Sequence, residues 1–208
     1  FSGSRGLWFL SDPERDLAQS IHPRLTDFEV IGSGLDVPVE YDPEGFRARH
    51  GIEGPFVMYA GRREGGKNWD SMLDAFARAV INADLPLSMV TMGHGVVESP
   101  PEIADRVIDL GYVSESERND AYAAASAYIQ PSGFESFSRT IMESWLAGTL
   151  VIATGASSVN QWHCERSGAG LIYDDADGFE ECLRFVPEEP DPAAAIAGFG
   201  ATFTASLP

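Results

Sequence analysis

A glycine-rich segment near residue 60 has the spacing of a phosphate site. Gly61, Gly66 and Lys67 stand where the phosphate-binding loop G-x-x-x-x-G-K-[ST] places its glycines and its lysine. That loop wraps backbone N–H groups around a phosphate and needs a final hydroxyl to hold Mg²⁺. Asn68 lacks the hydroxyl, and Glu64 would repel an anion inside the loop. We therefore do not expect the phosphate loop of an ATPase here.

Two cations of the same segment offer a different chemistry. Arg62 presents a planar fork of donors to phosphate oxygens and Lys67 presents a mobile point charge, so together they could hold a diphosphate without a metal. The alternative is that both are solvated surface cations. The chain has 14 basic and 32 acidic residues, and GRREGGK is its densest cationic cluster. This concentration of charge favours a diphosphate clamp.

Two carboxylates in the segment PSGFESFSRTIMESWLAG, residues 131–148, form a second candidate site. Glu143 interrupts an apolar helical stretch, where an unpaired carboxylate would cost several kcal/mol to bury. A hydrogen-bond donor is therefore expected beside it, and the vicinal hydroxyls of a ribose are a matching pair. The alternative is a structural pair with a nearby Ser or backbone N–H.

Glu135 precedes the same helix. The helix N-terminus near Ser138 to Thr140 favours phosphate, and the Glu135 carboxylate would face the same crevice, where it could accept from a sugar hydroxyl. The alternative for Glu135 is a carboxylate that only interacts with the helix dipole.

Weaker patterns predict neither a metal site nor a nicotinamide cofactor. Asp175 and Asp177 form D-x-D, but Asp177 is better explained as the cap of the helix GFEECLRFV. GHGVVE begins like G-x-G-x-x-G, yet Glu98 stands at the third glycine. The four histidines share no ligand spacing.

Short apolar runs alternate with helical patterns along most of the chain. This alternation predicts an α/β domain with a parallel six-stranded sheet and helices on both faces. The runs cover residues 56–60, 87–92, 106–110, 127–130, 149–154 and 170–173. Glycines follow most of them, at Gly61, Gly93, Gly111, Gly133 and Gly155. In an open parallel sheet ligands bind beyond the carboxyl ends of the strands, although such glycines also make ordinary tight turns.

Three helices have recognisable boundaries. An apolar stripe from Trp69 to Val80 predicts the first, with Asn68 as its N-cap. The capping box Ser114-x-x-Glu117 opens the second. The third is expected over residues 138–147, ending at Gly148.

Charge and composition narrow the class of partner. The net charge of −18 argues against nucleic acid or an anionic membrane surface. No apolar run reaches the roughly 20 residues that a membrane helix needs. The two cysteines, Cys164 and Cys182, have neither metal-site nor disulfide-scaffold spacing, which makes a reducing cytoplasm the default location.

The chain is expected to have three parts. Residues 1–36 contain an apolar strand, a helix and a second strand, which predict a βαβ unit. Residues 37–55 carry prolines and charge without clear periodicity, as a linker does. Residues 56–208 are expected to form the ligand-binding domain. Because the chain opens at Phe1 without Met and stops without a closing element, it resembles a piece of a longer protein.

The motifs together resemble one enzyme family. Glu135 and Glu143 form E-x7-E inside PSGFESFSRTIMESWLAGTLVIAT, which resembles the donor-site segment of retaining glycosyltransferases of family 4, the group 1 enzymes of GT-B fold. VIGSGLDVP, YAGRREGGKNWDSMLDAF, VTMGHG and DLGYVSESERNDAYAAASAYIQPS resemble other segments of the same family in the same order. The combination of glycines, E-x7-E and Arg/Lys is a strong signal.

The resemblance implies a Rossmann-like domain, one half of a GT-B fold, that binds a nucleoside diphosphate sugar of UDP or GDP type and needs no metal. By it Arg62 and Lys67 would bind the diphosphate beside the Gly61 and Gly93 turns, and Glu143 would bind the ribose. Glu135 would contact the donor sugar. The implied contacts with phosphates and base come from the backbone of Phe137, Ser138, Arg139 and Thr140 and from the loop Gly111, Tyr112 and Val113.

The sequence departs from the family pattern at several positions. Ser138 stands where Gly is common, Thr149-Leu150 replaces a common Pro-Val, and SSVNQWHCERSGAG lacks a frequent Gly-Gly-x-x-Glu. Residues 1–36 would be the last βαβ unit of an N-terminal acceptor domain that is otherwise missing.

The implied activity is transfer of a hexose-type sugar to an acceptor hydroxyl, with the isolated domain binding donor but transferring poorly. A stand-alone nucleotide-binding or interaction module is the alternative, and a GT-B-like epimerase or phosphorylase is a third. The sugar, base and acceptor are left open.

Overall fold

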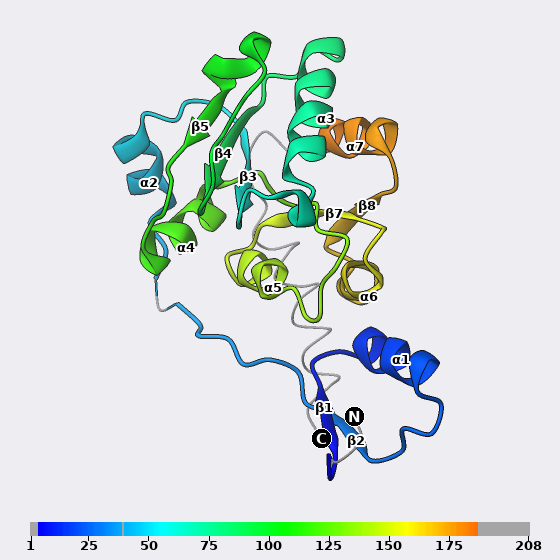
Figure 1. The fold of residues 1–208 in the computed structure, drawn as a ribbon. Coiled ribbons are helices and arrows are strands. Elements are labelled where there is room, and N and C mark those ends of the chain that lie inside the picture. Colours follow the sequence, from blue (N-terminus) through cyan, green and yellow to red (C-terminus); the bar gives the residue numbers. More distant parts are fainter. Residues whose placement is uncertain (1–3, 39, 187–208) are drawn as a thin grey trace.

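The computed structural model describes residues 4–38 and 40–186, which form a small unit and a large α/β domain (Figure 1). The large domain contains a parallel sheet in the order β5-β4-β3-β6-β7-β8. Its strands are β3 (Phe56–Ala60), β4 (Ser88–Met92), β5 (Val107–Asp109), β6 (Ala127–Gln130), β7 (Leu150–Thr154) and β8 (Gly170–Tyr173). All neighbouring pairs are parallel. The predicted six-stranded sheet is confirmed.

The strand order reverses between β3 and β6. From β3 the chain adds β4 and then β5 on one side, and it then returns to build β6, β7 and β8 on the other. In an open α/β sheet a crevice forms at this switch point, outside the carboxyl ends of the strands. The topology therefore places the segments after β3, β4 and β6 next to one another.

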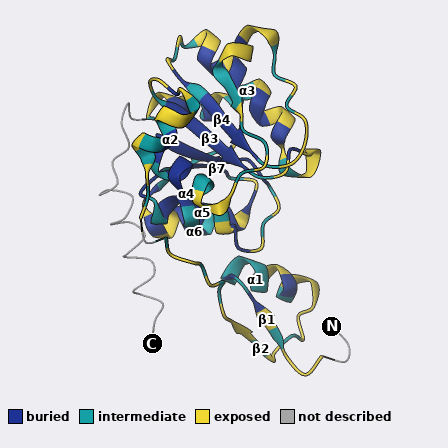
Figure 2. Ribbon diagram, turned by 90° about the vertical axis from the view of Figure 1, so that its left-hand side faces the viewer, coloured by how far each residue is buried: buried dark blue, intermediate teal, exposed yellow. Residues whose placement is uncertain are grey.

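Helices cover both faces of the sheet, as predicted. α3 (Trp69–Asn82) and α7 (Ala176–Arg184) pack on one face. The other face is covered by α2 (Pro43–His50), α4 (Glu115–Ala124), α5 (Arg139–Leu146) and α6 (Ser158–Ser167). Short 3₁₀ turns, η1 (Gly65–Lys67) and η2 (Pro101–Arg106), follow β3 and β4. Figure 2 shows the central strands buried between the helices.

β3 shows why both faces must be covered. Its side chains alternate between two apolar clusters, with Phe56, Met58 and Ala60 in one and Val57 and Tyr59 in the other. All five residues are buried. A strand that is apolar on both faces is stable only as the centre of a three-layer arrangement.

The small unit is the predicted βαβ element. β1 (Leu7–Phe9) and β2 (Phe28–Val30) pair in parallel, and α1 (Asp12–Ile21) connects them. Ser11 caps α1 by accepting from the backbone N–H of Glu14, and its Oγ also donates to the carbonyl of Ser136, 2.8 Å away in the large domain. α1 packs against α6, so the unit lies against the loop that leads into α5 (Figure 1).

The structure corrects one expectation for the interval 37–55, which contains α2 in addition to extended chain. Asp42 caps this helix and Gly51 ends it in a left-handed conformation. Phe46 is its one buried residue. A single apolar anchor gives no periodicity, which is why the sequence pattern did not reveal the helix.

One predicted cap is at the predicted position but makes no capping bond, and another is wrong. Asn68 precedes α3 but adopts a left-handed conformation and makes no capping bond, because its Nδ2 donates to the carbonyl of Pro131, 3.1 Å away. Asp175, rather than Asp177, caps α7 by accepting from the backbone N–H of Gly178.

The remaining predicted boundaries agree with the structure. Ser114 accepts from the backbone N–H of Glu117 at the start of α4, as its capping box predicts. α5 ends with Gly148 just beyond its cap, in a left-handed conformation. Residues 187–208, part of the predicted binding domain, lie outside the described residues. Among the described residues no helix is long and apolar enough to cross a membrane.

Candidate functional site

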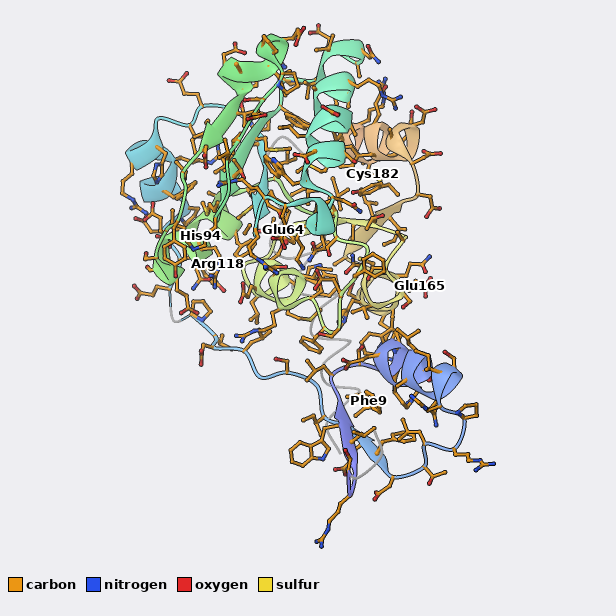
Figure 3. All side chains as sticks on the ribbon, viewed as in Figure 1. Phe9, Glu64, His94, Arg118, Glu165 and Cys182 are labelled. Carbon is orange, nitrogen blue, oxygen red and sulfur yellow. The ribbon has the colours of Figure 1, made fainter. Side chains whose placement is uncertain are left out.

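A pocket of about 240 Å³ lies at the carboxyl ends of β3 and β4, next to the first turns of α4 and α5. His94 and Arg118, which both line this pocket, are labelled near each other in Figure 3. The full lining is Ala60, Gly61, Arg62, Met92, Gly93, His94, Tyr112, Val113, Arg118 and Thr140. Six of these were predicted from the sequence as site residues: Gly61, Arg62, Gly93, Tyr112, Val113 and Thr140.

The glycine turns after β3 and β4 touch each other at the floor of the pocket. The backbone N–H of Gly61 donates to the carbonyl of Met92 at 2.9 Å. Gly93 has φ +130°, and a Cβ there would lie 2.0 Å from the carbonyl oxygen of Gly61. Glycine is therefore required at position 93 for both conformation and space.

Arg62 projects from this floor into solvent. Its side chain is 66% exposed and its guanidinium lies 3.3 Å from the Glu64 carboxylate. An exposed ion pair of this kind is weak, so the planar fork of Arg62 can be redirected toward an anion in the pocket.

Arg63 points the opposite way and is the main residue that sequence analysis missed. Its side chain is 1% exposed. Nε donates to Thr91 Oγ1 at 3.1 Å, and Nη1 donates to the carbonyls of Gly93 at 2.6 Å and Gly95 at 3.1 Å. Nη2 donates to the Asp109 carboxylate. Burial lowers the pKa of Arg63, and its ion pair with Asp109 opposes that shift. One guanidinium thus joins the ends of β3, β4 and β5.

Lys67 and Glu135 meet across the switch point. Lys67, at the end of η1, places Nζ 2.7 Å from Glu135 Oε1 and 3.5 Å from Ser132 Oγ. The Lys67 side chain is 28% exposed and that of Glu135 is 13% exposed. The two predicted site residues, far apart in the sequence, are therefore in direct contact.

Glu143 is enclosed on α5 and has the partner that its burial requires. Its side chain is 14% exposed, Arg118 Nη2 lies 3.4 Å from its Oε2, and the hydroxyl of Tyr122 donates to the same oxygen at 3.5 Å. Burial raises the pKa of Tyr122 well above its usual value, so the hydroxyl keeps its proton. The hydrogen-bond donor expected beside Glu143 is thus the Tyr122 hydroxyl, with the Arg118 guanidinium as an ion-pair partner, and neither was named from the sequence.

The loop before α5 is held in an unusual backbone conformation. Ser138 adopts φ 62°, in the left-handed region that favours glycine, which agrees with its standing where Gly is common. Its Oγ accepts from Gln130 Nε2 at 2.7 Å. The hydroxyl of Tyr128 donates to Thr140 Oγ1 at 2.8 Å. Phe137 is buried and Arg139 is exposed, so these predicted neighbours face in different directions.

His163, on α6, binds the backbone of the same loop before α5. Its Nε2 donates to the carbonyl of Phe137 at 2.8 Å, and its ring packs edge-on against the Phe137 ring. Burial lowers the pKa of His163 to about 4, with the Phe137 carbonyl opposing and Arg166 adding to that shift. A neutral, buried imidazole therefore fixes the backbone position next to Ser138.

We expect stability to depend on pH through His163. Because the folded pKa is about 4 and the ordinary value is 6.5, the unfolded chain binds the proton more tightly. The contribution is complete above pH 6.5 and is lost as pH falls from 6.5 to 4, by about 3 kcal/mol. Urea unfolding at pH 7 and pH 4.5 should show a smaller difference for His163→Gln, which does not titrate. An equal pH dependence in both proteins would contradict the assignment.

The loop after β5 contributes Tyr112 and Val113 to the lining of the pocket. Gly111 has φ 60°, its N–H donates to Asp109 Oδ1 at 2.8 Å, and its carbonyl accepts from Gly93 N–H at 2.8 Å. Tyr112 is 78% exposed and stacks on His94 with ring centroids 5.0 Å apart. Two aromatic faces therefore stand at the mouth of the pocket.

Nothing among the described residues groups three or more His, Cys, Asp or Glu side chains at a possible metal site. The D-x-D pair is used differently, since Asp175 caps α7 and Asp177 pairs with Arg78 at 2.6 Å. The side chains that line the pocket include two arginines, Arg62 and Arg118, and two aromatic rings, His94 and Tyr112. This set suits a phosphorylated ligand with a planar ring.

Comparison with known proteins gives a family match over most of the large domain. Residues 54–186 match the family model described as Glycosyl transferases group 1. Mannosylfructose-phosphate synthase of Agrobacterium fabrum is 28% identical over 122 residues, which are 52% of this chain and 27% of that protein. Phosphatidyl-myo-inositol mannosyltransferase of Mycolicibacterium smegmatis is 25% identical over 185 residues, 83% of this chain and 48% of that protein. The chain spans about half or less of these curated relatives.

Solved structures give the same fold. The structure of Anabaena HepE in complex with UDP-glucose matches with a TM-score of 0.77 at 18% identity, over 97% of this chain and 58% of that one. At this identity the match establishes the fold alone. The large domain is an α/β domain that corresponds to one half of GT-B structures, as the sequence motifs implied.

Proposed function

Because this chain belongs to the glycosyl transferases group 1 family, we propose that its large domain binds the donor of a retaining, metal-independent glycosyltransferase. The donor is a nucleoside diphosphate sugar of UDP or GDP type, and a hexose-type sugar passes to an acceptor hydroxyl. The observation that carries the proposal is the pocket at the carboxyl ends of β3 and β4, which is lined by Arg62, by Thr140 of α5 and by Arg118, the ion-pair partner of Glu143.

Arg62 and Lys67 bind the diphosphate of the donor. The guanidinium of Arg62 is exposed at the pocket, and Lys67 lies at the end of η1 in the same loop after β3. As the bond between sugar and diphosphate breaks, negative charge develops on the leaving group, and these two cations stabilise it as a metal does in other enzymes. Backbone N–H groups from Phe137 to Thr140 add donors at the start of α5.

The carboxylates of Glu143 and Glu135 bind the ribose and the transferred sugar. Glu143 accepts from the ribose hydroxyls, and its enclosure by Arg118 and Tyr122 fixes its direction. Glu135 contacts the donor sugar, and its bond to Lys67 holds it beside the diphosphate. The loop from Gly111 to Val113 lies beside the base.

The proposal extends to the whole protein. Residues 1–36 belong to an acceptor domain, residues 37–55 connect the domains, and residues 56–208 bind the donor. The parallel β1–β2 pair and the contact between Ser11 and Ser136 support a unit that continues a neighbouring sheet and touches the donor loop. The acceptor domain and the nucleotide sugar are the partners, without nucleic acid or direct membrane contact by this domain. Two free, buried cysteines fit a reducing cytoplasm.

Calorimetric titration with UDP, GDP, ADP and their common sugars tests donor binding. We expect Arg62→Ala and Glu143→Ala each to weaken the affinity by about 10- to 100-fold, because each loses a charged hydrogen-bonding group. Arg78→Ala is the matched control, since Arg78 pairs with Asp177 on α7 and does not line the pocket. The proposal fails if no nucleoside diphosphate binds at millimolar concentration, or if both substitutions leave affinity unchanged.

A further inference from the structure

Arg118 is a pocket-lining arginine whose hydrogen-bonding capacity is largely unused. Its side chain is 30% exposed, and it lies at 3.4 Å from Glu143 and 3.9 Å from Glu115. Neither approach has the geometry of a hydrogen bond, and its enclosed Nε has no partner among the described residues. A guanidinium has five N–H donors and no acceptor. Arg118 therefore presents a donor-only array at the pocket wall.

The position of Arg118 decides which part of a ligand it meets. It lies on α4, 3.4 Å from Glu143, and it lines the pocket together with Tyr112 and Val113, whereas Glu143 does not line it. If Glu143 holds the ribose, the group attached to the ribose on the Tyr112 side is the base. The inference thus rests on the proposed function of Glu143.

We infer that Arg118 selects the nucleobase, favouring a base with a keto oxygen at pyrimidine position 4 or purine position 6 over one with an amino group there. A keto oxygen accepts from the guanidinium. An amino group offers only donors, so that both it and the arginine remain unpaired when water is excluded. The pocket accordingly takes uracil or guanine nucleotides in preference to cytosine or adenine nucleotides.

The exposed face of Tyr112 complements this selection. Its stack on His94 holds the ring at the mouth of the pocket, where it can support the flat face of any base. Stacking is tolerant of base identity because every base has a π-face. Discrimination between bases is therefore assigned to the edge contact from Arg118.

Matched nucleotide pairs isolate the keto-to-amino exchange. Titration of the full chain compares UDP with CDP and IDP with ADP, because the members of each pair differ only in the keto-to-amino exchange and in the proton on the adjacent ring nitrogen. We expect the keto member to bind at least about 10-fold more tightly. In Arg118→Leu both ratios should fall below about threefold, and Arg118→Lys, which keeps the charge without the planar fork, should give intermediate ratios.

The ratio separates recognition from a structural role. An arginine that only positions Glu143 would, when removed, weaken all four nucleotides equally and leave the ratios unchanged, which would overturn the inference. Equal binding of keto and amino partners by the wild-type chain would overturn it as well, while leaving donor binding intact. Absence of binding by all four nucleotides contradicts the proposed function itself. If Arg118→Leu does not fold, the Arg118→Lys ratios decide.

Discussion

Replacing Arg63 with methionine is expected to lower the free energy of unfolding by about 3–5 kcal/mol. The substitution removes the donors that the carbonyls of Gly93 and Gly95 and the hydroxyl of Thr91 accept from, and it separates Asp109 from its buried partner. Removing one side of a buried network leaves the other side unsatisfied, which costs more than the net value of the bonds. Equilibrium urea unfolding at pH 7 measures the effect.

Arg62→Met is the matched control for this prediction. It removes the same charge from the neighbouring position, but the Arg62 side chain is 66% exposed and its ion pair is with the exposed Glu64. We expect a change within about 0.5 kcal/mol. Equal destabilisation by the two substitutions would show that loss of positive charge from an acidic chain, rather than the buried network, sets the stability.

Gly93→Ala is expected to destabilise the fold by about 3 kcal/mol or more and to abolish nucleotide binding. The new methyl group would meet the carbonyl oxygen of Gly61 at 2.0 Å, and the backbone would have to keep φ +130°. Neither strain can be relieved by a rotamer change, because the obstacle is backbone at the end of β3. Thermal unfolding and calorimetric titration with UDP measure the two effects.

Gly65→Ala gives the comparison for this second prediction. Gly65 lies in η1, in the loop after β3, has open space where a Cβ would stand, and shows no left-handed φ. A methyl group there is expected to be neutral or to stabilise by up to about 1 kcal/mol, because it reduces the freedom of the unfolded chain. Comparable losses for both substitutions would mean that an added methyl group is harmful even where space is open, and that the clash at Gly93 is not the cause.

Much of the fold could be predicted because its signals are local. Each strand of the large sheet is a short apolar run bounded by a glycine or a helix signal, as in FVMYA followed by Gly61. Strands that alternate with helices leave few topologies, since parallel connections cross over a face of the sheet. α2 escaped prediction because its one buried anchor, Phe46, makes no repeating pattern.

The candidate site was predicted less completely, because the side chains that hold its loops in place form hydrogen bonds with backbone carbonyls. His163 has no metal-ligand spacing to other histidines, yet it donates to the carbonyl of Phe137, and the Asn68 side chain donates to the carbonyl of Pro131 instead of capping α3. A carbonyl oxygen is present at every position, so such a partner leaves no trace in side-chain types. Arg118 could have been suspected, because the buried Glu143 needed a donor and a cation on the preceding helix could supply one.

The sequence by itself determined the layered α/β architecture and the glycine turns at the strand ends, because both follow from the period of apolar residues and from residues that permit special backbone angles. Only the tertiary structure decided between the adjacent arginines, exposing Arg62 and burying Arg63. The partners of Arg63 at Gly93, Gly95 and Asp109 stand 30, 32 and 46 residues away in the sequence. They meet because the parallel sheet brings the ends of β3, β4 and β5 to one edge, where a guanidinium can satisfy backbone carbonyls that no residue pattern announces.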